Sequence, residues 1–198
     1  MTDDQTRDDI RIIRTMLAKT KAATAESGTI FVLWGGLITA AMAVELVLSL
    51  NGLDRWIWLV WMTAGLIGWV ASILYGVRRG RREPVTSYVQ TAARHLYIGS
   101  GVGFLLVCFI FPLLKAYSYE EIPILFSAVA GILFFVMGGI FESPILRWFG
   151  LLWWGGGVGL TFLAGNTRQL AFGLLIVAGY DIPAVLVWAK HRKETAAR

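Results

Sequence analysis

Six apolar stretches of about 20 residues, separated by short charged connections, dominate this 198-residue chain. A stretch of that length suits one crossing of a bilayer, because a helix needs about 20 apolar residues to span the hydrocarbon core. Charged residues make up 16% of the chain, against about 25% in a soluble domain, and almost all of them lie between the apolar stretches. The sequence therefore predicts an all-α, polytopic transmembrane protein.

The predicted bundle of six transmembrane helices occupies residues 29–189. A polar lead-in, residues 1–28, precedes the bundle, and a basic tail, residues 190–198, follows it. The connections are short except the second, which covers residues 78–94, and Ser143 and Pro144 are expected to begin the fifth helix. The six spans are expected at residues 29–50, 56–77, 94–114, 122–141, 146–164 and 169–189.

The distribution of lysine and arginine predicts the orientation, because basic residues are enriched in cytoplasmic loops. Fifteen of the 18 lie in the lead-in, the second and fourth connections and the tail, whereas Arg55, Lys115 and Arg168 lie on the opposite side. Both termini are therefore expected in the cytoplasm, with the chain in a bacterial inner membrane. The net charge of +5 then reflects topology and attraction of the inner loops to anionic lipid, not nucleic-acid binding.

The lead-in is expected to form an amphipathic helix on the inner membrane surface. Ile10, Ile13 and Leu17 follow the i, i+3, i+7 spacing of one helix face. Such a face binds the boundary between headgroups and acyl chains. It could instead contact a protein partner, or the segment could be solvated, and the sequence leaves these alternatives open.

The last apolar stretch carries an acidic residue, Asp181, two residues before Pro183. A carboxyl group at this depth costs roughly 2.5–3.5 kcal/mol to insert. Pro183 cannot donate a hydrogen bond to the carbonyl of Gly179 and is expected to kink the helix. A protonated Asp181 could bond to a carbonyl that Pro183 leaves free, or to Ser or Thr on a neighbouring helix. Alternatively, Asp181 could lie on the pathway of a proton- or cation-coupled carrier or channel.

A second acidic residue, Glu45, lies near the outer end of the first span, from where a long side chain can reach the membrane surface. At about 1.5 Å per residue, Glu45 lies roughly 24 Å from the inner boundary and Asp181 roughly 12 Å. The two carboxyl groups are therefore not expected to touch, although they could mark successive points on one polar path. Glu120 and Glu121, in the third connection, are expected to be a solvated pair.

Two GxxxG motifs, Gly99–Gly103 and Gly155–Gly159, predict places where helices approach closely. In lipid, helices associate through packing of small residues, because no hydrophobic drive brings them together. With five other helices available, packing within one bundle is the favoured interpretation. A homo-oligomer formed through these faces is the alternative.

No motif indicates catalysis or a cofactor. The chain has one cysteine, Cys108, and two histidines, His95 and His191, outside any zinc-type spacing. It lacks a P-loop, a G-x-S-x-G elbow, an H-E-x-x-H pair and a dinucleotide fingerprint. This argues against the common enzyme classes, though not against every intramembrane enzyme, and we expect a non-enzymatic protein without a cofactor.

The lead-in sequence IRTM (Ile13–Met16), the glycine-bearing first span, the basic second connection and the short basic tail resemble a loose group of uncharacterised bacterial six-helix membrane proteins. The tryptophan- and glycine-rich fifth span departs from that group. The resemblance implies no activity and no site residue. We therefore expect an accessory or regulatory membrane protein, with a small carrier or channel that uses Asp181 as the alternative.

Overall fold

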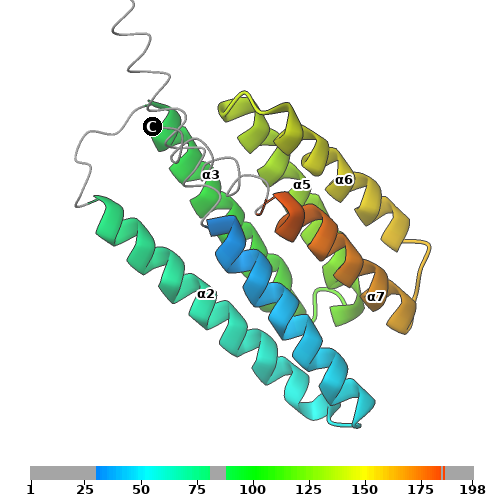
Figure 1. The fold of residues 1–198 in the computed structure, drawn as a ribbon. Coiled ribbons are helices and arrows are strands. Elements are labelled where there is room, and N and C mark those ends of the chain that lie inside the picture. The colour runs from blue at the N-terminus through cyan, green and yellow to red at the C-terminus, as the bar shows by residue number, and fades with distance from the viewer. Residues whose placement is uncertain (1–29, 81–87, 184, 186–198) are drawn as a thin grey trace, which may run out of the picture.

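The computed structural model describes residues 30–80, 88–183 and 185, and within these ranges every regular element is a helix. The predicted lead-in and tail, residues 1–28 and 190–198, lie outside the described residues. Figure 1 shows the helices side by side, running alternately up and down. The elements are a first helix (Ile30–Leu50), α2 (Ile57–Gly80), α3 (Tyr88–Leu105), α4 (Phe111–Leu113), α5 (Ile122–Ile140), α6 (Pro144–Leu160) and α7 (Gly165–Ile176).

Two π-helical turns continue these helices. Leu106–Ile110 joins α3 to α4, and Val177–Asp181 continues α7. Each turn ends two residues before a proline, Pro112 or Pro183. Because proline has no backbone N–H, the helical hydrogen-bond pattern is interrupted there, and a widened turn is one way for the helix to continue. At Pro183, where a kink is expected, the structure shows a π-helical turn just before the proline.

Four of the described helices are long and apolar enough to cross a membrane: Ile30–Leu50, Asp54–Arg78, Tyr88–Leu113 and Tyr119–Ile140. They cover the first four predicted spans. The remaining two helices are shorter: α6 has 17 residues, and α7 has 12 before its π-helical turn. They cover much of the fifth and sixth predicted spans. The clearest difference is that α3 begins at Tyr88, inside the predicted second connection, because that segment is rich in Ala, Gln and Arg, which favour helix.

The closest helix pair is α5 with α6, joined by a tight turn. Ser143 is the N-cap of α6 and Pro144 its first residue, as predicted, although the Ser143 side chain makes no capping hydrogen bond. The two backbones nearly touch. A Cβ atom added to Gly138 would lie 2.6 Å from the backbone nitrogen of Arg147, and one added to Gly150 would lie 2.7 Å from that of Phe135.

The Gly155–Gly159 motif does not make this contact. A Cβ atom added to either glycine would meet no atom of the described residues within 4 Å, and the same holds for Gly99. Among the described residues, the packing favoured from the sequence for the Gly155–Gly159 face is therefore not found, whereas a Cβ atom on Gly103 would lie 3.4 Å from Val129 of α5. The face that packs carries Gly150 and Gly157 instead, and a Cβ atom on Gly157 would lie 2.9 Å from Cβ of Ser127 on α5.

An aromatic cluster forms the core between the first helix, α5, α6 and the last helix. The rings of Phe31 and Phe134 stack with centroids 4.8 Å apart, and Tyr180 meets Phe134 edge-on at 5.2 Å. Trp153 lies 6.1 Å from Tyr180 and is fully buried. Offset and edge-to-face arrangements are those that aromatic rings prefer. This cluster brings the first and last helices against the α5–α6 pair.

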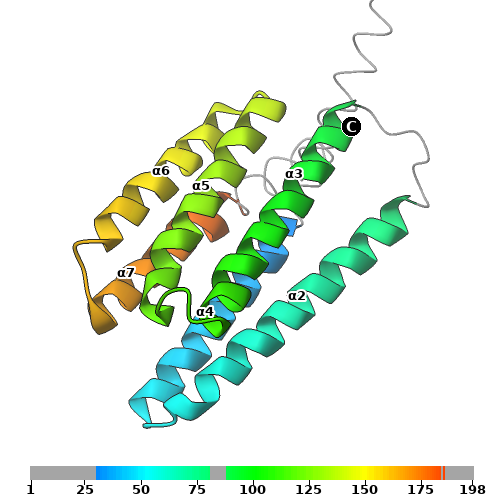
Figure 2. The same cartoon turned by 180° about the vertical axis from the view of Figure 1, so that it is seen from behind.

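α2 lies at the edge of the bundle, beside the first helix and α3 (Figures 1 and 2). It carries a row of exposed apolar side chains, among them Leu66, Ile67 and Ile73. The turn before it contains Gly52 with φ +68°, a conformation that glycine adopts without strain. An apolar face of this extent suits contact with lipid.

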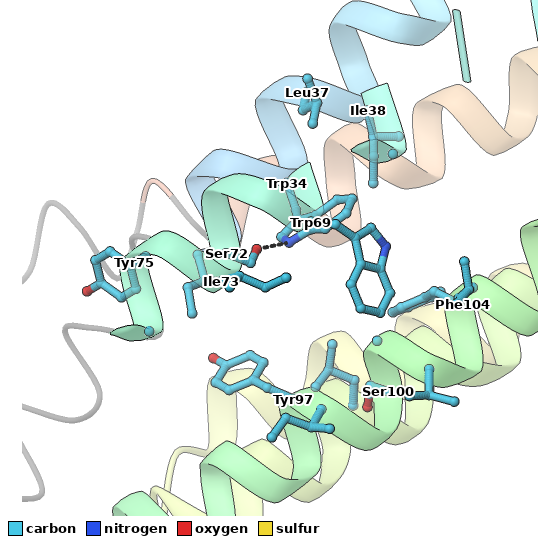
Figure 3. Close-up of a pocket in the computed structure, with 18 of the residues that line it drawn as sticks. Trp34, Leu37, Ile38, Trp69, Ser72, Ile73, Tyr75, Tyr97, Ser100 and Phe104 are labelled. Carbon is cyan, nitrogen blue, oxygen red and sulfur yellow. Dashed lines mark hydrogen bonds between the residues drawn. The ribbon is translucent and has the colours of Figure 1, made fainter. Parts of the chain in front are cut away.

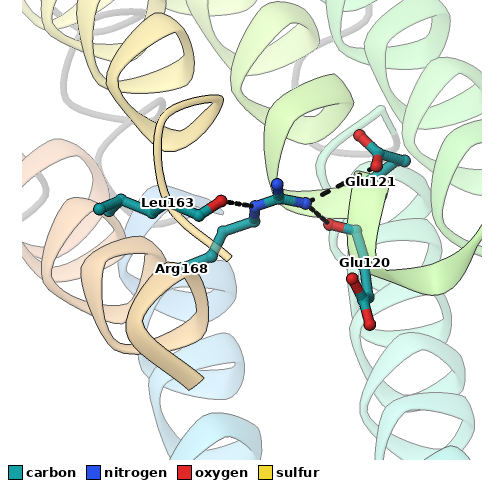
Figure 4. Close-up of polar contacts among 4 residues, drawn as sticks. All are labelled: Glu120, Glu121, Leu163 and Arg168. Carbon is teal, nitrogen blue, oxygen red and sulfur yellow. Dashed lines mark hydrogen bonds and ion pairs between the residues drawn. The ribbon is translucent and has the colours of Figure 1, made fainter. Parts of the chain in front are cut away.

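Arg168 joins two of the connections at one end of the bundle, as Figure 4 shows. Its Nε donates to the carbonyl oxygen of Leu163 at 2.8 Å, and one terminal nitrogen donates to that of Glu120 at 3.0 Å. The same nitrogen lies 3.7 Å from a carboxylate oxygen of Glu121. The Glu120 and Glu121 side chains are nonetheless solvated, as expected: Glu120 is exposed and contacts Arg168 only through its backbone, and the Glu121 side chain is 46% exposed.

Replacing Arg168 with methionine should destabilise the folded protein by about 1.5–3 kcal/mol, the range for hydrogen bonds to a charged group. The Arg168 side chain is only 13% exposed, so little solvent replaces the lost contacts. Thermal unfolding of the detergent-solubilised protein measures the effect. Arg55→Met is the control, because Arg55 lies near the same end and its guanidinium stacks on Trp56 instead. Equal losses for the two variants would contradict the role given to Arg168.

Candidate functional site

The two acidic residues singled out in the sequence, Glu45 and Asp181, both lie where the first and last helices meet. These helices run antiparallel. Three contacts along their length show this. Gly35 lies against Asp181, and Glu45 contacts Gln169. Between them, Met42 packs on Gly173, where an added Cβ atom would lie 3.1 Å from the Met42 methyl group. The first and last spans, remote in sequence, are therefore direct neighbours.

Asp181 occupies a notch on the first helix that Gly35 and Thr39 form; we call it the Gly35 notch. The Thr39 hydroxyl donates to Oδ2 of Asp181 at 2.7 Å. The other carboxylate oxygen, Oδ1, lies where a Cβ atom of residue 35 would be, so only glycine leaves room for it. Residues four apart share one helix face, which is why Gly35 and Thr39 contact the same carboxyl group. Asp181 thus faces another helix, with a threonine as partner.

The carbonyl that Pro183 leaves free has a partner other than Asp181. Nε1 of the fully buried Trp153, on α6, donates to the carbonyl oxygen of Gly179 at 3.0 Å. In the π-helical turn before Pro112, the Tyr117 hydroxyl similarly donates to a backbone carbonyl, that of Val107, five residues before the proline. At each proline, a side chain from outside the turn satisfies a backbone carbonyl, as burial in an apolar environment requires.

Glu45 is held by two other helices. Nε1 of Trp61, on α2, donates to Oε2 at 2.9 Å, and Nε2 of Gln169, on α7, donates to Oε1 at 3.0 Å. Its position in the sequence suggested a side chain that reaches the membrane surface. In the structure the side chain is instead half-buried, with both carboxylate oxygens bonded to other helices. Glu45 is six residues, or about 9 Å of helix, from Thr39, the partner of Asp181. The two acidic residues therefore occupy separate positions along the first helix.

A cavity of about 600 Å³ lies between the first helix, α2 and α3, as Figure 3 shows. One wall is the indole of Trp34, which donates to the Ser72 hydroxyl at 3.1 Å and packs on Gly68. Neither Asp181 nor Glu45 lines this cavity, although their neighbours Tyr180 and Trp61 do. The cavity could not be predicted from the sequence, since apolar side chains in a span can face lipid, another helix or a void.

The bond from Thr39 to Asp181 is of the kind expected from a Ser or Thr on a neighbouring helix, whereas the sequence did not identify Thr39 as the donor or predict the partners of Glu45. Thr39, Trp61 and Gln169 all stand within or beside apolar stretches, and the one available signal was that each is a polar donor in such a stretch. Within the described residues, no three His, Cys, Asp or Glu side chains gather closely enough to hold a metal ion. The chain matches no known protein family, no curated protein and no solved structure. Function is therefore inferred from geometry.

Proposed function

We propose that this chain is a six-span integral protein of a bacterial inner membrane, with both termini in the cytoplasm, and that it acts as a non-enzymatic accessory or regulatory protein. The six apolar stretches and the four long helices support this, as do α6 and α7, which run alongside α5 in Figure 1. Exposed tryptophans support it further. Trp56 and Trp58 lie toward one end of the bundle and Trp148 toward the other, as in the aromatic belts of membrane proteins.

The observation that carries the non-transport role is the placement of Asp181. A coupling carboxyl group in a carrier must face a path that water or ions can reach, and polar residues in spans commonly line such paths. Asp181 instead bonds to Thr39 across a helix contact and is not among the residues that line the cavity. Both oxygens of Glu45 accept hydrogen bonds from other helices as well. These contacts favour a structural role for both acidic residues.

In this proposal the regions that act on other molecules are those outside the bundle. The basic inner connections and tail would attract anionic lipid, at about 1 kcal/mol for each basic residue near the surface. The lead-in, residues 1–28, would lie on the membrane surface or bind a protein partner. A second copy of the chain could meet the open Gly155–Gly159 face, where an added Cβ atom meets no described neighbour.

Flux measurements test this function directly. Vesicles that contain the purified protein should show the same proton and potassium leak as protein-free vesicles, when measured with an internal pH dye and a potential-sensitive dye. Asp181→Asn keeps the volume and hydrogen-bonding capacity of the side chain but cannot ionise, so it should leave folding and the leak unchanged. Flux through the wild-type protein that a folded Asp181→Asn variant has lost would instead identify a carrier or channel.

Single-cysteine labelling tests the six-span topology. With Cys108 replaced by serine, cysteines at Asn51 and Asn166 should react with a membrane-impermeant maleimide from outside the cell. A cysteine at Glu142 should react only after the membrane is opened. Labelling of positions 142 and 166 from the same side would show that α6 does not cross the membrane, and the chain would then have fewer than six spans.

A further inference from the structure

The cavity between the first helix, α2 and α3 has one polar end and one apolar end. On α2 the described polar side chains of the lining, other than the indole of Trp61, lie from Trp69 onward, and on α3 they lie at or before Ser100. The lining also includes Trp34 of the first helix, Tyr180 of the last helix and the thiol of Cys108. On both helices, therefore, the polar lining residues lie toward the connection that joins α2 to α3. Figure 3 shows four of them: Ser72, Tyr75, Tyr97 and Ser100. The polar end is lined by Ser72, Tyr75, Gln90, Arg94, Tyr97 and Ser100.

The opposite end of the cavity is apolar. Its walls come from the first half of α2 and from the end of α3 with its π-helical turn. The indole N–H of Trp61 is already bonded to Glu45, so that residue presents its ring face and edge to the cavity. A polar ligand group here would lose its water without gaining a partner, which is costly. This end is lined by Trp61, Ala64, Gly65, Phe104, Cys108 and Phe109.

One positive charge stands at the polar end. Arg94 is the only charged residue among the described residues that line the cavity. It is exposed, and no described side chain forms an ion pair with it. A guanidinium group binds phosphate through paired hydrogen bonds. α3 begins at Tyr88, near which a lipid headgroup would lie. Arg94 is about 9 Å further along the helix, and its long side chain can extend toward the headgroup.

We infer that this cavity binds an anionic phospholipid of the surrounding bilayer, with one acyl chain between α2 and α3 and its phosphate at Arg94. The volume of about 600 Å³ falls in the range of sites for small molecules, about 300–1,000 Å³. The apolar end matches hydrocarbon, the polar end matches glycerol and ester groups, and Arg94 matches a phosphate. This inference extends the proposed accessory role, because a bound lipid gives the protein a way to respond to membrane composition.

Lipid retention by the purified full-length protein tests the inference. The protein is mixed in detergent with phosphatidylglycerol and phosphatidylcholine of identical acyl chains, and retained lipids are counted by native mass spectrometry. The wild-type protein should retain one phosphatidylglycerol in preference to phosphatidylcholine. Arg94→Gln should weaken that retention roughly fivefold, the effect of losing one basic contact. Arg147→Gln, which removes an exposed arginine of α6 outside the cavity lining, should leave it unchanged.

A pair of glycine variants tests the position of the acyl chain. Gly76 lines the cavity and Gly99 does not, and a Cβ atom at either would meet no described atom within 4 Å. Gly76→Leu should therefore lower retention while Gly99→Leu does not. Phosphatidylglycerol with a photoreactive acyl chain should label residues 61–69 and 104–109 in the wild-type protein.

Equal retention of the two lipids, equal effects of Arg94→Gln and Arg147→Gln, or labelling spread over the exposed faces of the bundle would each overturn the inference. None of these results depends on ion flux. A protein that binds the lipid and also conducts ions would contradict only the proposed function. A protein that does neither would contradict only the lipid site.

Discussion

Gly150→Leu should be among the most destabilising single substitutions in this protein. A Cβ atom at residue 150 would lie 2.7 Å from the backbone nitrogen of Phe135 and 2.9 Å from its Cα atom. A backbone cannot rotate away as a side chain can, so α6 would have to move off α5 along their whole contact. Overpacking typically costs about 1–3 kcal/mol, and a backbone obstacle places this variant at or above that range.

Gly155→Leu is the matched control, because it makes the same chemical change five residues later in α6. A Cβ atom there meets no described atom within 4 Å. We expect unfolding temperature and expression level close to wild type, since leucine also favours helix more than glycine does. Similar losses for Gly150→Leu and Gly155→Leu would show that the α5–α6 contact does not depend on the glycine face described above.

Gly35→Ala should be strongly destabilising for a different reason, which is the Asp181 carboxylate in the Gly35 notch. The added methyl group would clash with Asp181 Oδ1, so the carboxyl group would have to move away from Gly35 and from its bond with Thr39. A half-buried carboxyl group would then lose its partner, and we expect a cost of about 1–3 kcal/mol in unfolding free energy. Gly36→Ala is the control, because a Cβ atom at Gly36 meets open space.

A double-mutant cycle assigns this cost to the carboxylate. In an Asp181→Ala background the obstacle is gone, and the remaining neighbour, Cδ1 of Tyr180, would lie 3.5 Å from the new methyl group, an ordinary contact. Gly35→Ala should therefore cost little in that background. The coupling between the two sites should lie at about 0.5–3 kcal/mol, as for residues in direct contact. Gly35→Ala costs that are equal in both backgrounds would show that Asp181 does not occupy the notch.

Local features of the sequence determined where the helices lie. Stretches of apolar residues predicted each described helix, because a backbone in lipid must satisfy its own hydrogen bonds and does so as a helix. Ser143 and Pro144 marked the beginning of α6, since a proline fits the first helical position. Pro183 marked where the hydrogen-bond pattern of the last helix changes, through a π-helical turn. Each of these depends on residues close together in the chain.

Only the tertiary structure decided which faces of the helices meet. In water, a helix buries its apolar stripe, and the stripe can be read from the sequence. In lipid the outward face is also apolar: Leu66 of α2 is 66% exposed, whereas Leu133 of α5 is 3% exposed, yet both are leucines in apolar spans. The rotation of each helix about its axis therefore leaves little trace in the pattern.

For the same reason, the tertiary structure alone selected Gly150 rather than Gly155 as a contact, paired Trp153 with the carbonyl of Gly179, and placed the Asp181 carboxylate against Gly35. These choices follow from the packing of side chains between helices distant in sequence, which is the force that associates helices where no hydrophobic drive exists. The presence of an acid and a proline in the last span could be read from the chain, but their partners came from the first helix and α6.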